Sequence, residues 1–270
     1  MTDPRPVIEI AWGAATDPGG RAHNEDRYLA ARPVFSVADG MGGNRGGELA
    51  STQVIAALEP MAGREWLDPA ELDLAIVEAA HVLARLGDGR GAPGSTLAGV
   101  GLVDSVGRPC WLVFNIGDSR VYLLQGERLE QVSTDHSLVQ EHAAADDAAQ
   151  ATRVPRNLIT RAIGAGQPGV PEPDRWLLPA RTGDRLLICS DGLTGELTDH
   201  LIAATLLACD DPQVCAQELV RTAVEAGARD NVTVVVVDAV AVSTGAGDLE
   251  PPSMPDLVEM TVPGEERHDG

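Results

Sequence analysis

Six short segments of the chain are rich in leucine and β-branched residues. They cover residues 34–39, 97–103, 110–116, 120–124, 185–190 and 232–240. Segments of this length and composition predict β-strands. The last one reads VTVVVVDAV and is apolar at both alternating sets of positions. This predicts a strand that is buried on both faces inside a layered structure.

Other segments place apolar residues every three or four positions, which is the spacing of one helix face. The clearest covers residues 69–87, with a proline where a helix starts and a glycine where it ends. Its apolar face is formed by Leu72, Ile76, Ala79, Ala80, Leu83 and Leu86. Further helices are predicted at about residues 47–62, after Asp135, and across the segment that carries Cys215, Leu219, Thr222 and Ala226.

The links between neighbouring strands are short and turn-like. DSVGRP separates the second predicted strand from the third, and GDS separates the third from the fourth, so antiparallel hairpins are expected. Long amphipathic helices are inserted in pairs, which is not the βαβ alternation of a parallel sheet. The pattern predicts an α+β fold in which antiparallel sheets are covered by helices.

The composition changes once, after the apolar run that ends near Val242. The last segment, STGAGDLEPPSMPDLVEMTVPGEERHDG, is rich in Gly, Pro, Asp and Glu and has too few apolar residues to order itself. We therefore expect one domain, residues 1–242, followed by a flexible acidic tail, residues 243–270.

The 270 residues carry a formal charge of −21, and all 20 basic residues are arginines. Nucleic acids and anionic membranes attract cationic surfaces, so neither is an expected partner. The absence of lysine excludes a P-loop lysine and a Schiff-base lysine. An acidic protein that acts on a phosphate ester needs a local source of positive charge, and bound metal ions are the obvious one.

The expected location follows from equally simple features. No stretch of eighteen apolar residues occurs, and the start MTDPRPVIEI has neither a basic leader nor an apolar signal core, so we expect no membrane span and no export. The four cysteines form no C-x-x-C pair, and two of them lie in apolar strand-like runs. Buried thiols of this kind are typical of a reducing compartment, so a cytoplasmic protein is expected.

Four aspartates share one local setting, at the end of an apolar run or in the turn beside one. They are Asp39 in FSVADGMGG, Asp118 in VFNIGDSRVYL, Asp191 in LLICSDGL and Asp230 in ARDNVTVVVV. For any one of them an ordinary turn is the commoner explanation, because Asp and Gly are frequent turn residues. Four such carboxylates predict a shared cleft, in which they would repel each other unless cations were bound. Oxygen ligands favour Mg²⁺ or Mn²⁺ over Zn²⁺, and the bare carbonyl of Gly40 is a further candidate ligand.

The segment GGRAHNEDRYLA places Arg21, Glu25 and Asp26 before the first of these strands. The planar fork of an arginine fits phosphate oxygens. The two acidic residues are candidates for holding metal-bound waters. A solvated charged loop is an equally good interpretation of the same residues.

Three other patterns are set aside. The G-x-G-x-x-G match that starts at Gly164 is followed by prolines, so no helix can start there to bind a dinucleotide. His136 follows Asp135 where a helix begins, which favours a capping or surface role over catalysis. Asn231 fits a glycosylation sequon but opens a buried strand in a chain that is not expected to be secreted.

Eight motifs follow one another along the chain: R-x-x-NEDR, VADGMGG, GSTLAG, NIGDSRVY, TDHSLVQE, RNLITRAIG, LLICSDGL and ARDNVTVVVV. In this order, over about residues 8–240, they resemble the bacterial branch of the metal-dependent protein phosphatases, the type 2C (PPM) family. The resemblance implies a four-layer αββα sandwich of two antiparallel β-sheets flanked by helices. It also implies a metal centre between the sheets at one end.

The resemblance implies a metal-binding role for five residues. Asp39 would bridge two metal ions, and the carbonyl of Gly40 would bind the second of them. Asp191 and Asp230 would complete the first ion. Asp118 would hold a third ion together with Asp191, so the implied cofactors are two to three Mn²⁺ or Mg²⁺ ions.

Other positions match the family in part. Arg21 matches the arginine that grips the substrate phosphate, and Glu25 and Asp26 match positions that support water ligands. Met41 stands where some eukaryotic members have a histidine, so the leaving group would take its proton from a metal-bound water. Segment 141–157 is shorter and richer in Ala and Asp than the usual flap beside the active site.

The implied activity is hydrolysis of phosphoserine and phosphothreonine in proteins by direct attack of a metal-bridging water or hydroxide. The expected partners are phosphorylated proteins and the bacterial serine/threonine kinases that the enzyme would oppose, and a monomer is the expected state. Two alternatives stay open: a pseudo-phosphatase that binds phosphoproteins through the same cleft, and a hydrolase of small phosphorylated metabolites. Turnover of p-nitrophenyl phosphate with Mn²⁺ and then EDTA tests the first, and a comparison of metabolites with phosphopeptides tests the second.

Overall fold

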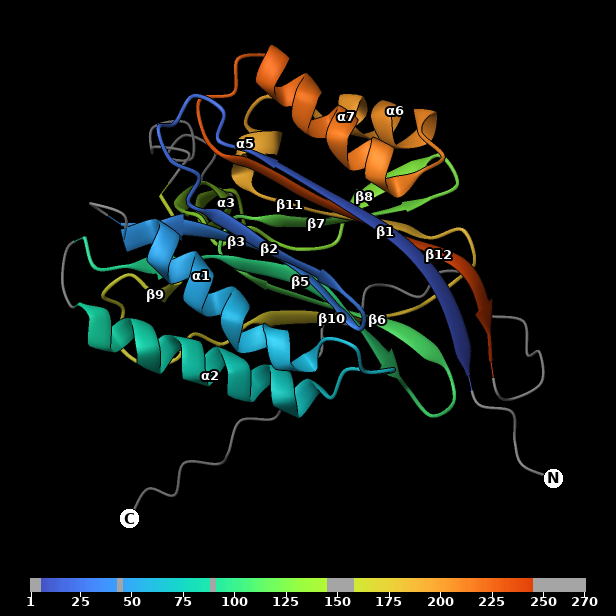
Figure 1. The fold of residues 1–270 in the computed structure, drawn as a ribbon, viewed down its shortest axis with the longest axis horizontal. Helices are drawn as coiled ribbons and strands as arrows, with labels where there is room; N and C mark the ends of the chain where they lie inside the picture. The colour runs from blue at the N-terminus through green and yellow to red at the C-terminus, as the bar shows by residue number, and fades with distance from the viewer. Residues whose placement is uncertain (1–5, 43–45, 88–90, 145–157, 245–270) are drawn as a thin grey trace.

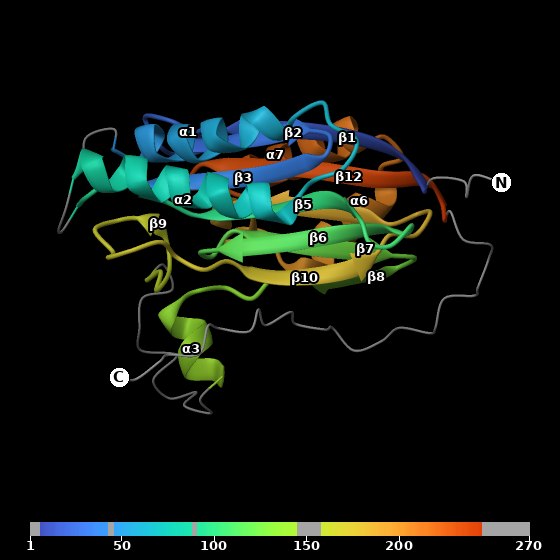
Figure 2. The same cartoon turned by 90° about the horizontal axis from the view of Figure 1, so that it is seen from below.

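The computed structural model describes residues 6–42, 46–87, 91–144 and 158–244. Two antiparallel β-sheets lie face to face, and helices cover the outer face of each sheet (Figure 1, Figure 2). This arrangement confirms the predicted four-layer α+β sandwich.

The first sheet has five strands in the order β1-β12-β11-β7-β8. Their bounds are Val7–Asp17 (β1), Val232–Ser243 (β12), Arg185–Cys189 (β11), Arg120–Gln125 (β7) and Arg128–Gln131 (β8). Strand β1 pairs with β12 from end to end, with Val7 opposite Ser243 and Asp17 opposite Val232. The first and last described strands therefore lie side by side in one sheet.

The second sheet has seven strands, six of them in the order β10-β6-β5-β3-β4-β9, while β2 pairs with β3. Their bounds are Asp174–Pro179 (β10), Pro109–Ile116 (β6), Leu97–Asp104 (β5), Val34–Met41 (β3), Gly94–Ser95 (β4), Ile163–Gly164 (β9) and Asp26–Ala31 (β2). In the β2–β3 hairpin Asp26 lies opposite Asp39. Two of the predicted acidic candidates are thus direct neighbours across strands.

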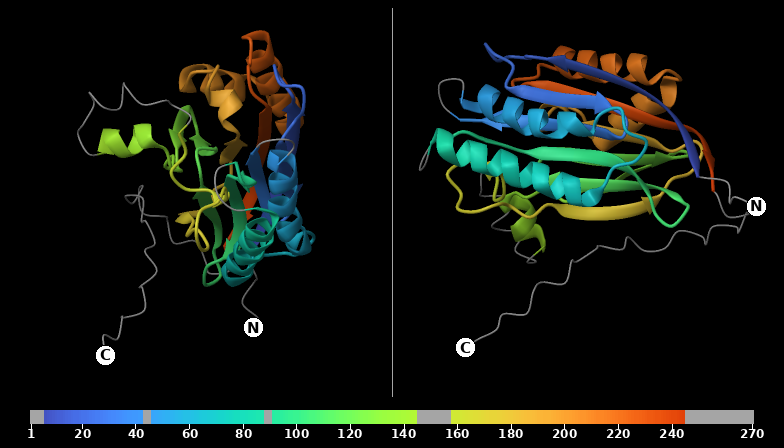
Figure 3. Two further views of the ribbon diagram at one scale, coloured as in Figure 1. Left: turned by 90° about the vertical axis from the view of Figure 1, so that its left-hand side faces the viewer. Right: turned by 60° about the horizontal axis from the view of Figure 1, so that its bottom comes forward.

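Two pairs of helices form the outer layers, α1 and α2 on the second sheet and α6 and α7 on the first (Figure 3). The helices are α1 (Gly46–Leu58), α2 (Pro69–Leu86), α3 (Leu138–Ala144), α5 (Asp191–Thr194), α6 (Asp199–Ala208) and α7 (Pro212–Glu225), with a 3-10 turn at Glu59–Met61. Before α2 and α7 stand Asp68 and Asp211, whose side chains accept hydrogen bonds from free backbone N–H groups of the first turn. Each is followed by a proline, which fits the first helical position.

The core is divided into three layers, one between the sheets and one between each sheet and its helices. Strand β12 contributes to two of them with alternate side chains. Val235 and Val237 pack between the sheets, whereas Val234 and Val236 pack under α6 and α7. This explains why VTVVVVDAV is apolar on both faces and confirms its predicted burial.

Strand β1 forms an edge of the first sheet, and the start of α7 covers part of that edge. The side-chain amide of Gln213 accepts a hydrogen bond from Ala14 N (3.1 Å) and donates one to Ala14 O (2.8 Å). Gly13 permits this approach, because a Cβ there would lie 2.2 Å from Cα of Gln213. The contact occupies backbone groups that another strand could otherwise use.

All six predicted strands are present, as β3, β5, β6, β7, β11 and β12. The predicted helix 69–87 is α2, and the predicted helix 47–62 is divided between α1 and the 3-10 turn. Strand β12 extends one residue beyond position 242, and residues 245–270 lie outside the described ranges, so the flexible tail stays a prediction. None of the helices in the described ranges has the length and hydropathy needed to cross a bilayer.

Candidate metal centre

The four aspartates singled out in the sequence lie at one end of the two sheets. Asp39 is near the end of β3, Asp118 is in the turn from β6 to β7, and Asp191 starts α5 just after β11. Asp230 precedes β12, whose first residues run antiparallel to the last residues of β11. The strand directions therefore bring four distant chain segments to one place.

The carboxyl groups of these aspartates are close enough to raise one another's pKa values. Burial raises the pKa of Asp39 well above its ordinary value, and the charges of Asp26, Asp191, Asp118 and Asp230 raise it further. Burial and then the charge of Asp230 raise the pKa of Asp191. Shifts of this kind arise when carboxylates share one poorly solvated site. The structure thus brings the four predicted aspartates together.

Several oxygens of this centre are buried and have no hydrogen-bond partner among the described residues. Burial, followed by the charge of Asp191, raises the pKa of Asp118 to about 7. Asp118 is 7 % exposed, and its Oδ1 and that of Asp191 are unpaired. Buried, unpaired carboxylate oxygens destabilise a fold, and they are the ligands that Mg²⁺ and Mn²⁺ prefer. The donor set therefore fits such cations.

No three acidic, histidine or cysteine side chains within the described ranges already form a metal-binding group. A centre for hydrated cations does not need one. Mg²⁺ usually keeps several waters and takes one or two carboxylates from the protein. The chemistry of the donors thus favours oxygen-bound, partly hydrated ions over a closed protein shell.

Asp26 does not lie in a solvated loop, which was one interpretation of its segment. It starts β2, is 2 % exposed and lies opposite Asp39. Burial raises its pKa to about 7, although the nearby hydroxyls of Thr233 and Ser190 act to lower it. Both of its carboxylate oxygens are buried, and neither has a hydrogen-bond partner within the described residues. Asp26 is therefore part of the acidic centre itself.

Arg21 lies at the exposed rim of the centre. Its Nη2 donates to Oδ2 of Asp230 at 2.6 Å, and the two side chains are 56 % and 41 % exposed. The charges of Asp39 and Glu25 also act on its guanidinium. An exposed ion pair of this kind contributes only about 0.2–1 kcal/mol, so the guanidinium can leave Asp230 for another anion.

Two glycines allow α1 to approach the end of β3. A Cβ at Gly40 would lie 2.0 Å from the carbonyl oxygen of Gly47. A Cβ at Gly47 would lie 2.6 Å from the carbonyl oxygen of Gly40 and 2.8 Å from Cδ of Glu25. No side chain fits in either space. The glycines thus bring the Gly40 carbonyl and the Glu25 carboxyl group close to the same point.

Sequence reasoning missed Thr96, which connects two parts of the centre. Its Oγ1 accepts a hydrogen bond from Asp39 N (2.9 Å), and its N–H donates to Asp39 O (2.9 Å). The same hydroxyl is hydrogen-bonded to Oγ of Ser119 (2.8 Å). Thr96 therefore ties the end of β3 to the turn that carries Asp118. Its signal in the sequence is the GSTLAG motif, which marks the family without indicating a role.

Asn231 attaches the loop of Arg21 to the start of β12 and was also missed. Its Oδ1 accepts from Glu25 N (2.8 Å), and its Nδ2 donates to the carbonyl oxygens of Pro18 and His23 (3.0 Å each). The residue is buried, with its amide oxygen and nitrogen both hydrogen-bonded. These contacts hold the loop beside Asp230.

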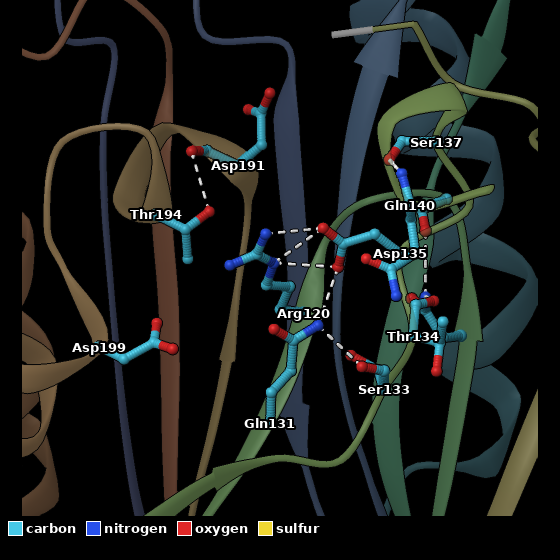
Figure 4. A network of polar contacts seen from close by, with 12 residues as sticks. Arg120, Gln131, Ser133, Thr134, Asp135, Ser137, Gln140, Asp191, Thr194 and Asp199 are labelled. Atoms are coloured by element: carbon cyan, nitrogen blue, oxygen red, sulfur yellow. Dashed lines mark hydrogen bonds and ion pairs between the residues drawn. The ribbon is translucent and has the colours of Figure 1, made fainter. Parts of the chain in front are cut away.

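A second polar network surrounds Arg120, two residues after Asp118 (Figure 4). Nε of Arg120 donates to Oδ1 of Asp135 at 2.9 Å, and Nη2 donates to Oδ2 at 2.7 Å. Gln131 Nε2 donates to the same Oδ1 at 2.9 Å. The carboxylate of Asp191 points away from Arg120 in Figure 4. Asp135 is thus the carboxylate that pairs with Arg120.

The predicted capping or surface role of His136 is wrong. His136 is 7 % exposed, and its ring contacts Gly117 and Asp174 instead of the first turn of α3. At the start of α3 it is Ser137 whose Oγ accepts a hydrogen bond, from Gln140 N at 3.3 Å. His136 is buried against the turn that follows β6 and against the start of β10, an environment that the helical pattern after Asp135 does not reveal.

The two positions that depart from the family pattern are Met41 and segment 141–157. Met41 ends β3 and offers no titratable group. In the atypical segment 141–157, residues 141–144 belong to α3, whereas residues 145–157 lie outside the described ranges.

Comparison with known proteins identifies similar chains. The chain is 36 % identical over 252 residues to the serine/threonine protein phosphatase PstP of Mycobacterium tuberculosis, which covers 87 % of this chain and 46 % of PstP. The chain thus spans less than half the length of that relative. It is 32 % identical over 240 residues to the serine/threonine phosphatase stp of Listeria innocua, which covers 82 % of this chain and 89 % of stp.

Comparison of the fold with solved structures also identifies serine/threonine phosphatases as similar proteins. A crystal structure of the catalytic domain of PstP in complex with two manganese ions superposes with a TM-score of 0.75 and 33 % identity, covering 87 % of this chain and 100 % of that one. No protein-family model matches the chain. The two sequence relatives and the shared fold show that the chain belongs to the bacterial type 2C (PPM) family of metal-dependent serine/threonine protein phosphatases.

Proposed function

We propose that this protein removes phosphate from phosphoserine and phosphothreonine in proteins, using two or three Mn²⁺ or Mg²⁺ ions. The observation that carries the proposal is the group of buried aspartates with unpaired oxygens at one end of the sandwich. An exposed arginine lies beside it. The names of the relatives, and the two manganese ions in the PstP structure, support the same activity.

The proposed ligands are those carboxylates and one backbone carbonyl. Asp39 would serve two ions, with the Gly40 carbonyl on one of them and Asp191 and Asp230 on the other. Asp118 would hold a third ion together with Asp191. Cations bound there would lower the pKa of water and offset the negative charge that develops on the phosphoryl group.

The acidic residues beside these ligands would hold hydrated ions in place. Asp26 is buried against Asp39, and the Glu25 carboxyl group lies near Gly47 and the Gly40 carbonyl. Carboxylates in such positions orient water ligands through hydrogen bonds. We therefore assign Glu25 and Asp26 to positioning water rather than to direct contact with substrate.

Arg21 would bind the substrate phosphate. Its planar guanidinium offers paired N–H donors that fit two phosphate oxygens. It is exposed, and within the part of the chain that the structure describes its guanidinium is paired with Asp230 alone, so an incoming dianion can attract it. The side chain of Met41 cannot donate a proton, so the serine or threonine oxygen would take its proton from water.

The proposed partners are phosphorylated proteins and the kinases that produce them. The net charge of −21 disfavours nucleic acid, and we expect the enzyme to act as a monomer. All four cysteines are free thiols, which is typical of a reducing compartment and favours the cytoplasm.

The proposal is tested with p-nitrophenyl phosphate and a panel of phosphoserine, phosphothreonine and small phosphorylated metabolites. Activity should require Mn²⁺ or Mg²⁺, disappear with EDTA and favour the phosphopeptides. Asp39→Asn should lower kcat by about a hundredfold or more, because an electrostatic group at the reacting centre is lost. Asp210→Asn, at an exposed position outside the centre, is the matched control. Wild-type turnover by Asp39→Asn, or turnover that survives EDTA, would refute the proposal.

A further inference from the structure

The turn that carries Asp118 has an unusual backbone that His136 holds at two points. Gly117 has φ +108°, and a Cβ there would lie 2.6 Å from Thr96. Its N–H donates to Nδ1 of His136 (3.0 Å), and its carbonyl oxygen accepts from the backbone N of His136 (2.9 Å). One residue thus binds both polar groups of the glycine that precedes Asp118.

These contacts fix the state of the imidazole ring. Nδ1 accepts a backbone N–H and therefore carries no proton. Nε2 lies 3.0 Å from Oδ2 of Asp174 and carries the proton that it donates. Burial lowers the pKa of His136, in agreement with a neutral ring. Both ring nitrogens are used, one toward the Asp118 turn and one toward β10.

The far side of the ring is connected to residues 159–161. Asp174 accepts a hydrogen bond from Arg161 Nη1 at 2.5 Å. The carbonyl oxygen of His136 accepts from Thr160 N at 2.9 Å, and Ser137 forms a β-bridge with Ile159. His136 therefore connects the residues just before α3 with residues 159–161.

The Asp118 carboxyl group depends on this turn for its position. Among the described residues its Oδ1 is buried without a hydrogen-bond partner, so the position of this oxygen is set through the backbone of the turn. On the other side of the turn, Arg120 is held by both oxygens of Asp135 (Figure 4). Adjacent residues 135 and 136 thus hold the two ends of the turn around Asp118.

We propose that His136 is a positioning residue, which aims the Asp118 carboxylate into the metal centre by holding Gly117. The inference rests on the proposed function, in which Asp118 binds a cation. Residues that orient a metal ligand without touching the metal typically change metal affinity by about 10–100-fold when they are replaced.

Two substitutions of similar polarity separate the two sides of the ring. In His136→Asn, the side-chain amide lies near the position of Nδ1 and can accept the Gly117 N–H, but it does not reach Asp174. In His136→Gln, the amide lies near the position of Nε2 and can bond to Asp174, but not to Gly117. A general packing role of His136 predicts that the smaller Asn side chain weakens the site at least as much as Gln does.

The experiment is a titration with Mn²⁺ by calorimetry, without substrate, for the wild type, both variants and Asp118→Ala. Asp118→Ala should weaken the weakest Mn²⁺ site, and His136→Gln should weaken the same site by about tenfold or more. His136→Asn should stay within about threefold of the wild type, and so should His200→Ala, an exposed control on α6.

The outcomes test the role of His136 and the cation role of Asp118 separately. Equal Mn²⁺ affinities for the Asn and Gln variants, or a weaker Asn variant, would overturn the role of His136. If Asp118→Ala leaves the titration unchanged, the cation role of Asp118 is wrong and this inference falls with it. The activity and EDTA tests of the other aspartates remain independent of that result.

Discussion

Replacing Asp118 with asparagine should stabilise the metal-free protein although it removes a proposed metal ligand. The Asp118 carboxyl group is buried beside Asp191, and its Oδ1 has no hydrogen-bond partner in the described ranges. An ionised group in that position costs free energy of folding. Asparagine has nearly the same shape and carries no charge, so it removes the cost without opening a cavity.

The size of the expected stabilisation follows from the shift in the pKa of Asp118. Burial and Asp191 raise the pKa of Asp118 from 3.8 to about 7. Three units at about 1.4 kcal/mol each give a destabilisation of at most about 4 kcal/mol when the group is fully ionised. Below about pH 4 the group is protonated in both folded and unfolded chains, so the substitution changes little there. Between about pH 4 and about pH 7 the unfolded chain is ionised while the folded protein keeps the proton, so the folded protein loses relative stability across this range, and the loss is complete above it.

The assay is urea unfolding in EDTA at about pH 4.5 and about pH 8, with Asp210→Asn as an exposed control. Asp118→Asn should gain stability over the wild type mainly at the higher pH, whereas the control should not. With saturating Mn²⁺ the order should reverse, because the wild type binds the cation more tightly. Equal stabilities at both pH values, or a less stable variant at the higher pH, would refute the reasoning.

Three further changes test other parts of the centre. Without phosphate, Arg21→Gln should raise the Mn²⁺ affinity measured by calorimetry about two- to fivefold, because the ion pair with Asp230 no longer competes with the cation. The gain should disappear in an Asp230→Asn background, and a gain that persists there would contradict the competition. Gly40→Ala should lower Tm by several degrees or prevent folding, because its Cβ would lie 2.0 Å from Gly47 O; an unchanged melting curve would show that α1 is not so close. Mn²⁺ affinity should fall as the pH drops below about 7, where Asp118 becomes protonated, and a flat pH profile of the titration would contradict the raised pKa.

The parts of the fold that sequence predicts well are those with a strong, regular pattern. Strand β12 is apolar on both faces because it packs both against the second sheet and under helices α6 and α7. Helix α2 combines an apolar face with a capping aspartate, Asp68, and a proline. Strand β1 was missed because VIEIAWGAATD is a partly exposed strand at a sheet edge, where the alternation of apolar and polar residues is weak.

The aspartates that gather at the candidate site were predictable from the sequence, whereas their surroundings were not. Asp39, Asp118 and Asp191 stand beside apolar runs that are visible in the sequence. Asp26, by contrast, is buried beside Ser190, which follows β11, and Thr233 in β12, and both are distant from it in the sequence. No local pattern around an acidic motif contains that information.

The partners of His136 are equally distant along the chain. Its ring bonds to Gly117 and Asp174, which reach it through the pairing of β6 with β10. The residues just after His136 form a helix, so the local pattern favours a surface position. Only the sheet topology shows that the ring contacts both β10 and the Asp118 turn.

The central claim is that carboxylates from separate strands converge on divalent cations. Diffraction from crystals grown with Mn²⁺, measured at a wavelength where manganese scatters anomalously, tests it most directly. The account predicts manganese peaks in contact with carboxylate oxygens of Asp39, Asp191 and Asp230. Manganese bound only elsewhere, in crystals of protein that hydrolyses phosphopeptides with Mn²⁺, would contradict it.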